Sequence, residues 1–402
     1  MIFIHTADWH LGQTFFGYER NYEHSEFLNW LVKTIGERGA DVLLISGDIF
    51  DTPNPSAAAQ RTFYNFIHEV TQKNPNLRII VTAGNHDSGA RLEAPDTLLG
   101  YLGATVRGTI KRNNDGTLDY QRHIIPLSED TCCIALPYLR QGDYPTAESY
   151  SEGVKDTFLA VAEEAKRVYK NIVIMGHLFA VGGEVSTDDR SERTVVGGLD
   201  CVDLSAVADV ATYVALGHLH KAQCVGEYRN IRYSGAPLPM SFAEIDNRQS
   251  VTMITLNGKE SKTEEIEIPH TVTLIRIPKE GAAPIATVLD EISQLPEGNA
   301  TETSPFLEIR IAITEPEPTL RQTIEQAVEG KAVRLTRMEA LSEQGTSKID
   351  APLTYDEVRN LDPQMLANDF FRRNFNNNDM PESLQMLLKE VITEIRNEDF
   401  SN

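Results

Sequence analysis

Short apolar runs rich in β-branched residues alternate with longer amphipathic stretches over roughly the first 270 residues. The runs have the length of buried strands, and helical spacing marks several stretches between them. The predicted strands are 42–45, 79–82, 172–175, 213–216 and 251–256, and the clearest helices are 23–37 and 60–72. Because this alternation is typical of layered domains, the sequence predicts an α/β fold with buried sheets.

A second, smaller pattern begins near residue 272. It predicts a strand at 272–277, a helix at 285–295, a strand through Leu307, Ile309, Ile311 and Ile313, a helix at 319–328 and a strand at 332–335. Apolar residues at every second position are typical of a half-buried strand. We therefore expect four parts along the chain: 1–270, a β-α-β-α-β module at 271–340, a polar linker at 341–352 and C-terminal helices at 353–402.

The C-terminal part carries two apolar helical faces. One stripe consists of Leu384, Leu387, Leu388, Val391, Ile392 and Ile395, and an upstream face consists of Leu366, Phe370, Phe371 and Phe375. These helices either pack on their own domain or dock into a partner. Docking is plausible because the segment follows a polar linker and is too short to form a core alone. The candidate partner contacts are Phe370, Phe371, Leu384, Leu388 and Ile392.

The 402-residue chain has a formal net charge of −22. This acidity argues against a free-standing DNA-binding protein, because contacts with phosphates need clustered Lys and Arg. A DNA-acting protein of this charge needs a local basic patch, bound metal cations or a basic partner. No apolar run approaches the roughly 18 residues of a membrane helix, and the N-terminus reads as a strand and not as a signal peptide. The four cysteines form no C-x-x-C pair, so we expect a cytoplasmic protein without a membrane segment.

Five short motifs lie at the ends of predicted strands. They are Asp8-Trp9-His10, Gly47-Asp48-Ile49-Phe50-Asp51, Gly84-Asn85-His86-Asp87, Gly176-His177 and Gly217-His218-Leu219-His220. On an extended strand, residues i and i+2 share a face, so each D-x-H or H-x-H pair is expected to reach one ion. The glycines are expected at sharp, crowded turns. Each motif alone is weak evidence, but together they indicate a site for manganese, iron or zinc, since the donors are oxygen and nitrogen without thiolates.

The order D-x-H, G-D-x-x-D, G-N-H-D, G-H, G-H-x-H resembles the calcineurin-like metallophosphoesterase superfamily. Within it, segments 5–12 and 212–220 are similar to the SbcD-type nucleases, and the resemblance covers essentially the whole chain. It implies a sandwich of two β-sheets flanked by helices, with a small α+β capping domain and C-terminal helices. The parts at 1–270, 271–340 and 353–402 would then be the nuclease domain, the capping domain and the helices that bind an ATPase partner.

The resemblance implies two divalent metal ions, with Mn²⁺ expected. Asp48 would bridge both ions. One site would be completed by Asp8, His10 and His220, and the other by Asn85, His177 and His218. The implied chemistry is hydrolysis of a phosphodiester by two ions that polarise the phosphate and lower the pKa of a water.

His86 is implied to be catalytic and not a metal ligand. It would face the scissile phosphate and stabilise or protonate the leaving 3′-oxygen. Asp51 is assigned with it, because in phosphatase members the matching Asp pairs with this histidine. Archaeal and eukaryotic relatives carry His at that place, so a solvated turn residue remains the alternative for Asp51.

The implied function is a nuclease subunit of an SbcC–SbcD-type complex, a hydrolase acting on ester bonds. It would be a 3′–5′ double-strand exonuclease and a single-strand and hairpin endonuclease that processes DNA ends in repair and recombination. The partners would be double-stranded and hairpin DNA and the SMC-like ATPase SbcC, whose coiled-coil base the C-terminal helices would bind. A homodimer within a heterotetramer is implied, with 60–72 as one candidate face, and association with the nucleoid when on DNA.

Two other functions are weighed against this one. A phosphatase or small-molecule phosphodiesterase is disfavoured, because protein phosphatases read G-D-x-x-D-R-G and G-N-H-E, whereas Thr52-Pro53 and Asp87 stand here. A scaffold without metals ranks last, because every expected ligand is present. Candidate DNA contacts are Arg91 and the basic pair Lys111 and Arg112, near an Asp115-Gly116 turn that is equally well explained as an ordinary solvated hairpin.

Overall fold

The computed structural model describes residues 1–184, 201–258, 260–314, 317–342, 367–368, 370–372, 380–381 and 384–389. The chain divides into two compact units, Met1–Thr273 and Leu274–Asn402. The first unit contains all five motifs, and the second unit contains the β-α-β-α-β module.

Two six-stranded sheets form the centre of the first unit. The first sheet has the order β14-β13-β1-β4-β5-β6, with bounds Glu260–Glu267, Ser250–Asn257, Ile2–Thr6, Val42–Ser46, Arg78–Thr82 and Ala104–Arg107. Strands β1, β4, β5 and β6 are parallel, and β13 and β14 are antiparallel to their neighbours. All five residues of β4 are buried, as expected for a parallel strand covered on both faces.

The second sheet has the order β11-β12-β10-β9-β8-β7. Its bounds are Gln223–Val225, Tyr228–Tyr233, Tyr213–Gly217, Asn171–His177, Thr131–Ala135 and Ile124–Pro126. Strands β12, β10, β9 and β8 are parallel, whereas β11 and β7 are antiparallel edge strands. A two-stranded hairpin lies outside both sheets and consists of β2, Thr14–Phe15, and β3, Tyr18–Glu19.

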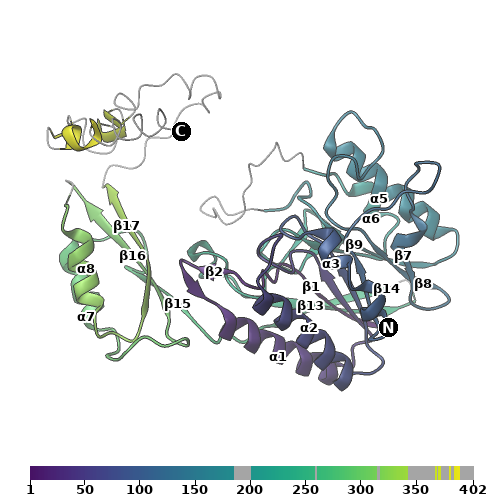
Figure 1. Ribbon diagram of the computed structural model, residues 1–402, viewed down its shortest axis with the longest axis horizontal. Coiled ribbons are helices and arrows are strands. Elements are labelled where there is room, and N and C mark those ends of the chain that lie inside the picture. Colours follow the sequence, from purple (N-terminus) through teal and green to yellow (C-terminus); the bar gives the residue numbers. More distant parts are fainter. Residues whose placement is uncertain are drawn as a thin grey trace. The chain divides into compact units, whose positions relative to one another are not determined.

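Three apolar clusters show that the first unit has four layers. Helices α1, Asn21–Arg38, and α2, Ala57–Lys73, pack on one face of the first sheet. Helices α5, Tyr150–Lys166, and α6, Ser205–Ala208, pack on the outer face of the second sheet. Between the sheets lies a third cluster that includes Phe3, Met175 and Tyr213. Figure 1 shows α1 with α2 on one side and α5 with α6 on the other, so the predicted two-sheet sandwich flanked by helices is confirmed.

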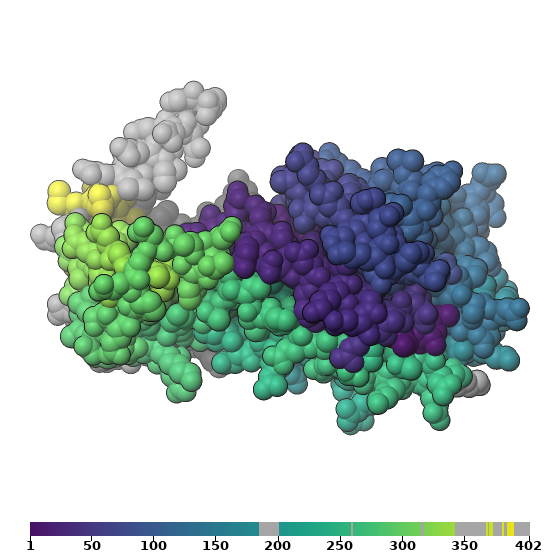
Figure 2. Space-filling view, turned by 90° about the horizontal axis from the view of Figure 1, so that it is seen from below, coloured from purple at the N-terminus to yellow at the C-terminus, as the bar shows by residue number. Residues whose placement is uncertain are grey.

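Local sequence explains where the long helices begin and end. The Ser56 side chain accepts a hydrogen bond from the backbone N–H of Ala59 at 3.1 Å, which caps α2 at its start. Gly39 ends α1 in a left-handed conformation with φ of 60°, which glycine adopts without a Cβ penalty. Near this end, Arg38 reaches Glu264 of β14 at 3.1 Å, and Figure 2 shows N-terminal atoms (purple) beside atoms from this later segment (green).

The strands predicted from apolar runs are confirmed, and the two clearest helices are each longer by a few residues than predicted. The short helices α3, Gly89–Glu93, and α4, Asp96–Gly100, and the 3-10 turns Gln121–His123 and Phe242–Glu244, were not predicted. These elements are too short to show a periodicity in the sequence.

The second unit contains a parallel sheet with the order β15-β16-β17. Its elements are β15, Leu274–Ile277; α7, Ile285–Ser293; β16, Phe306–Ile313; α8, Leu320–Val328; and β17, Arg334–Ser342. The predicted module is therefore confirmed. Strand β17 extends past the predicted start of the linker at 341, because its last residues pair with Ala312 and Ile313 of β16.

Little of the C-terminal part is described. Phe370 and Leu384 are exposed, Leu388 is half-buried and Phe371 is buried. Ile392 lies outside the described residues, as does most of the predicted linker. In the described part of the chain, no helix is long and apolar enough to cross a membrane.

Trp9 offers a test of how the core supports the motif residues on either side of it. Its ring is fully buried, makes edge contacts with Phe27 and Phe66 at 5.7 and 5.1 Å between centroids, and donates from Nε1 to Thr6 Oγ1 at 2.9 Å. Trp9→Ala should cost about 3–5 kcal/mol of unfolding free energy. It should also weaken metal binding, because Asp8 and His10 flank the cavity.

Ile35→Ala near the C-terminal end of α1 is the matched control, since it removes a buried apolar side chain of the same cluster that belongs to no motif. We expect a similar loss in urea unfolding in the presence of EDTA, with unchanged metal affinity by calorimetry. Equal losses of metal affinity in both variants would show that Trp9 has no special role beside Asp8 and His10.

Candidate active site

The loops that follow β1 and β4 run side by side and bring the first two motifs together. Asp8 N–H donates to Gly47 O at 3.1 Å, and His10 N–H donates to Asp48 O at 3.0 Å. These three motif residues have positive φ angles of 55°, 46° and 49° for Asp8, His10 and Asp48. Left-handed backbone at residues other than glycine is strained, and the paired loops hold it in place.

This backbone corrects the expectation that Asp8 and His10 share the face of a strand. Strand β1 ends at Thr6, so both residues lie in a turn beyond it. The same holds for His218 and His220, because β10 ends at Gly217 and His218 has a φ of 106°. The pairs reach one centre through turn geometry and not through strand alternation.

Two motif glycines are required by close approach. A Cβ atom added at Gly84 would overlap Asp48 Oδ1, and one added at Gly217 would overlap the Ser46 carbonyl oxygen. These contacts join the loops after β4, β5 and β10, and no larger residue fits without moving the backbone.

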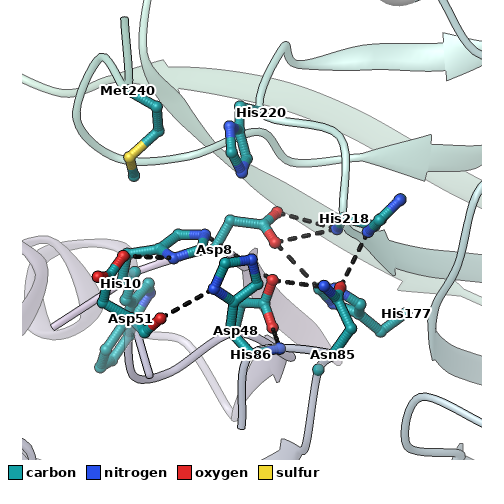
Figure 3. Close-up of polar contacts among 12 residues, drawn as sticks. Asp8, His10, Asp48, Asp51, Asn85, His86, His177, His218, His220 and Met240 are labelled. Atoms are coloured by element: carbon teal, nitrogen blue, oxygen red, sulfur yellow. Dashed lines mark hydrogen bonds and ion pairs between the residues drawn. The ribbon is translucent and has the colours of Figure 1, made fainter. Parts of the chain in front are cut away.

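The Asp48 carboxylate lies at the centre of the cluster, as Figure 3 shows. Its Oδ2 is 3.2 Å from His177 Nε2 and 3.8 Å from His10 Nε2. Its Oδ1 accepts the backbone N–H of His86 at 2.8 Å. A carboxylate with ligand-type side chains on two sides is placed as a bridging ligand would be.

The Asn85 amide oxygen lies close to the ring nitrogens of the two other residues expected in the second metal site. It lies 2.9 Å from His177 Nε2 and 3.0 Å from His218 Nδ1. Asp8 completes the connection between the sheets, because its carboxylate accepts the His218 backbone N–H at 2.9 and 3.2 Å.

The donor atoms fit divalent cations. Three groups each have ligand atoms within 4.8 Å of one another: Asp8, His10 and His220; His10, Asp48 and His86; and Asp8, Asp48 and His177. Nε2 of His10 is buried and makes no hydrogen bond within the described residues, which is costly unless a ligand or ion meets it. The mixed carboxylate, imidazole and amide set suits a borderline metal.

Hydrogen bonds to backbone carbonyl oxygens fix the ring orientation of two histidines. The Nδ1–H of His177 donates to Ser46 O at 2.9 Å, which leaves Nε2 toward Asp48 and Asn85. Such a bond behind a ligand sets its tautomer and orientation. His86 is held in the same manner, since its Nδ1–H donates to Asp51 O at 2.9 Å.

The Asp51 side chain does not pair with His86. Asp51 binds His86 through its backbone carbonyl, and its carboxylate lies 3.3 Å from His10 Nδ1. The expected catalytic pairing of Asp51 is therefore wrong as regards the carboxylate, because the turn at Asp51 directs its side chain toward the buried His10 ring. The Asp51 carboxylate contacts the expected ligand His10, and the Asp51 carbonyl accepts a hydrogen bond from His86.

Burial and neighbouring charges shift the pKa values of the site residues in opposite directions. Burial raises the pKa of Asp8 to about 7 and lowers the pKa of His218 to about 3. Burial would also raise the pKa of Asp48 and lower that of His177, but attraction between these two outweighs it. The pKa of His177 rises to about 9, and that of Asp48 lies well below its usual range. Asp48 is therefore ionised near neutral pH, whereas Asp8 is close to half-protonated.

Asp87 is a functional residue that the sequence analysis did not assign. Its buried carboxylate accepts the backbone N–H groups of Gly84, Ile49 and Phe50 at 2.9, 3.1 and 3.0 Å. Burial raises its pKa to about 6. Asp87 thereby ties the Asp48 loop to the Asn85–His86 loop, and only its place inside a motif distinguished it in the sequence.

Glu244 lies behind His220 and was also missed. It is buried, with Oε1 3.8 Å from His220 Nδ1 and Oε2 accepting the Met240 N–H at 3.1 Å. Figure 3 shows His220 and Met240 on the side of the cluster opposite Asp48. No sequence motif surrounds Glu244, so only the fold reveals its position.

The predicted DNA contacts lie outside this cluster. Lys111 Nζ is 3.9 Å from Glu93 Oε1, and Arg112 donates to the carbonyls of Gly116 and Gly142 at 2.8 and 2.7 Å. Arg91 donates to the Asn54 side chain. The structure confirms a hairpin around Asp115-Gly116, because Asn113 N–H donates to Thr117 O at 2.8 Å.

Family models match both units. A model described as calcineurin-like phosphoesterase matches residues 1–222. Another, described as type 5 capsule protein repressor C-terminal domain, matches residues 270–375.

Curated relatives match over most of their length. A relative from Rhodobacter capsulatus, named as the SbcD component of the nuclease SbcCD, is 36% identical and covers 83% of this chain and 86% of its own. The protein of the same name from Escherichia coli K12 is 27% identical over 98% and 97% of the two chains. That from Bacillus subtilis is 31% identical over 78% and 80%.

The two family models match the chain in the order of its two units, with the phosphoesterase model on the first unit and the other model almost wholly on the second. The phosphoesterase model spans more than half of the chain, and the Rhodobacter relative exceeds 30% identity over more than two thirds of it. The chain therefore belongs to the SbcD-type nuclease family of the calcineurin-like phosphoesterases.

Proposed function

We propose that this chain is the metal-dependent nuclease subunit of an SbcC–SbcD-type complex and hydrolyses phosphodiester bonds in DNA. The observation that carries the proposal is one cluster in which His86 adjoins the full expected ligand set. That set consists of Asp8, His10, Asp48, Asn85, His177, His218 and His220. Relatives named as nuclease subunits over nearly the full chain favour DNA as the substrate over a small phosphomonoester.

The ligand side chains would hold two divalent ions, and we propose Mn²⁺. Bound ions of this kind neutralise charge on a phosphate and lower the pKa of a water. Asp48 would serve both ions from its central position. The hydrogen bond that His177 donates to Ser46 O and the 3.3 Å contact between the Asp51 carboxylate and His10 Nδ1 would keep both rings aimed at the cluster.

His86 would act on the leaving group. Its Nδ1–H is committed to the Asp51 carbonyl, so Nε2 is the atom available to the substrate. A doubly protonated ring would donate from Nε2 to the departing 3′-oxygen while Nδ1 keeps its bond. The ring also lies 4.8 Å from that of His10, edge to face, which keeps it beside the metal ligands.

The finer features of the proposal concern assembly and products. We propose 3′–5′ exonuclease activity on duplex ends, endonuclease activity on single strands and hairpins, and association with the nucleoid. The chain would form a homodimer, with 60–72 in α2 as one candidate face, inside a heterotetramer with an SMC-like ATPase. Such a partner would supply ATP hydrolysis and DNA affinity that a chain of net charge −22 lacks.

Replacing His86 tests the assignment of the general acid. His86→Gln should lower DNA cleavage by roughly 10²–10⁴-fold, the range expected for a positioned acid, while both ions still bind by calorimetry. His270→Gln, at an exposed position beyond the end of β14, is the control and should cleave normally. Loss of an ion in the His86 variant would make His86 a ligand.

Replacing Asp48 tests the bridge. Asp48→Asn should remove both ions, because one carboxylate serves both, whereas His10→Ala should empty mainly one position. Asp156→Asn on the exposed face of α5 is the control, since it makes the same substitution away from the cluster, and it should keep both ions. Anomalous diffraction at the metal edge measures occupancy, and one fully occupied ion in the Asp48 variant would refute the bridge.

Removing the residues after Asp350 tests the partner site. The ligands all lie at or before His220, so the shortened chain should stay folded and cut DNA with manganese. It should no longer co-elute with the ATPase in size-exclusion chromatography. Leu388→Asp should also abolish co-elution, since an apolar side chain buried at an interface contributes about 2 kcal/mol or more to binding.

Gln385→Asp is the matched control, because Gln385 is exposed on the same helical turn and receives the same charge. It should leave co-elution intact. Co-elution of the shortened chain with the ATPase would place the interface elsewhere.

A further inference from the structure

Arg140 lies against the active-site loops, although nothing in the sequence pattern singled it out. It follows β8 in the segment that reaches the G-N-H-D loop, where Tyr138 N–H donates to Ala83 O at 2.8 Å. Nη2 of Arg140 donates to the carbonyl oxygens of Asn85 and Asp87, both at 3.4 Å. The guanidinium is therefore beside the loop that carries both a metal-type ligand and His86.

Neighbouring groups hold this side chain toward the cluster. The guanidinium carbon of Arg140 lies 5.4 Å from the centroid of the Tyr138 ring. The same ring meets His177 edge to face at 6.3 Å. The backbone N–H of Arg140 donates to Asp143 Oδ2 at 2.8 Å, which fixes the base of the side chain.

In the part of the chain that the structure describes, no carboxylate neutralises the charge of Arg140, in contrast to the charges of Lys111, Arg122 and Arg107. Lys111 and Arg122 share the Glu93 carboxylate, and Arg107 pairs with Asp96 at 3.2 Å. Within the described residues, no carboxylate oxygen lies within 4.0 Å of the Arg140 guanidinium. Its Nε and Nη1 donate to no acceptor there, and the side chain is exposed.

We infer that Arg140 binds a phosphate of the DNA strand next to the phosphate that is cleaved, an inference that rests on the proposed function. A guanidinium offers parallel N–H donors that match two phosphate oxygens. The two 3.4 Å hydrogen bonds from Nη2 orient the guanidinium and leave the N–H groups of Nε and Nη1 available to a phosphate. One such cation at the mouth of the site also offsets, locally, the acidity of the chain.

Arg140→Gln tests the inference in the full-length chain. For duplex DNA we expect KM to rise roughly tenfold or more, as for loss of a charge-assisted hydrogen bond. The slope of log binding constant against log salt should fall by about 0.9, the contribution of one phosphate contact on duplex DNA. Hydrolysis of bis(p-nitrophenyl) phosphate, which has no neighbouring phosphate, should keep its kcat within about twofold.

Two variants sharpen the result. Arg140→Lys keeps the charge and should restore the salt slope while regaining only part of the affinity. Arg167→Gln removes the same charge from an exposed ion pair with Glu164 at the C-terminal end of α5 and should change neither quantity. If Arg140→Gln instead slows both substrates equally and leaves the salt slope unchanged, Arg140 only braces the Asn85–Asp87 loop and the inference is wrong.

Binding experiments separate this inference from the proposed function. Anisotropy of labelled duplex is measured in the His86→Gln background, so that the DNA is not consumed, with Arg140 or Gln at position 140. If duplex binds with equal salt slopes whether Arg or Gln is at position 140, the contact between Arg140 and a phosphate is wrong, but the proposed nuclease function is not contradicted. Absence of duplex binding with Arg140 present would overturn both.

Discussion

The site depends on the carboxylate of Asp87, which ties the loop carrying Asp48 to the loop carrying Asn85 and His86. It accepts three backbone N–H groups, from Gly84 in its own loop and from Ile49 and Phe50 in the next. Bonds to a charged acceptor contribute about 1.5–3 kcal/mol each. The strained backbone at Asp8, His10, Asp48 and His218 costs about 1–3 kcal/mol per residue. The two sums are of the same order, so a strained cluster of ligands persists because buried hydrogen bonds offset its strain.

The sequence predicts which residues meet but not how they meet. Apolar runs place β4, β5, β9 and β10, and parallel strands bring their carboxyl ends to one edge, so the convergence of the motifs within each sheet follows from periodicity. The turns do not follow, because nothing in D-x-H reveals that Asp8 and His10 have left-handed backbone. For the same reason the sequence predicts that Asp51 pairs with His86 but not through which atom, and the partner in the structure is the Asp51 carbonyl.

Residues that act from behind the cluster are harder to predict than the ligands. Glu244 and Arg140 stand in stretches without a motif, and they reach the site only because loops after β12 and β8 fold back on it. Asp87 is inside a motif, yet its role depends on N–H groups from residues 38 and 37 positions earlier in the chain. Such long-range bonds to the backbone leave no pattern in the amino-acid types, so a single sequence does not contain the signal.

The site depends on both sheets, and this couples metal binding to the packing between them. Asp8 and Asp48 follow strands of the first sheet, whereas His177 ends β9 of the second sheet and His218 and His220 follow its β10. Between the sheets the side chains of Phe3, Met175 and Tyr213 are fully buried, so the spacing of the two ligand sets is fixed by close packing. Ions bound across this junction would stabilise the folded state by their affinity for it. A change of volume in the inter-sheet core should therefore alter metal affinity as well as unfolding, even though no core residue touches an ion.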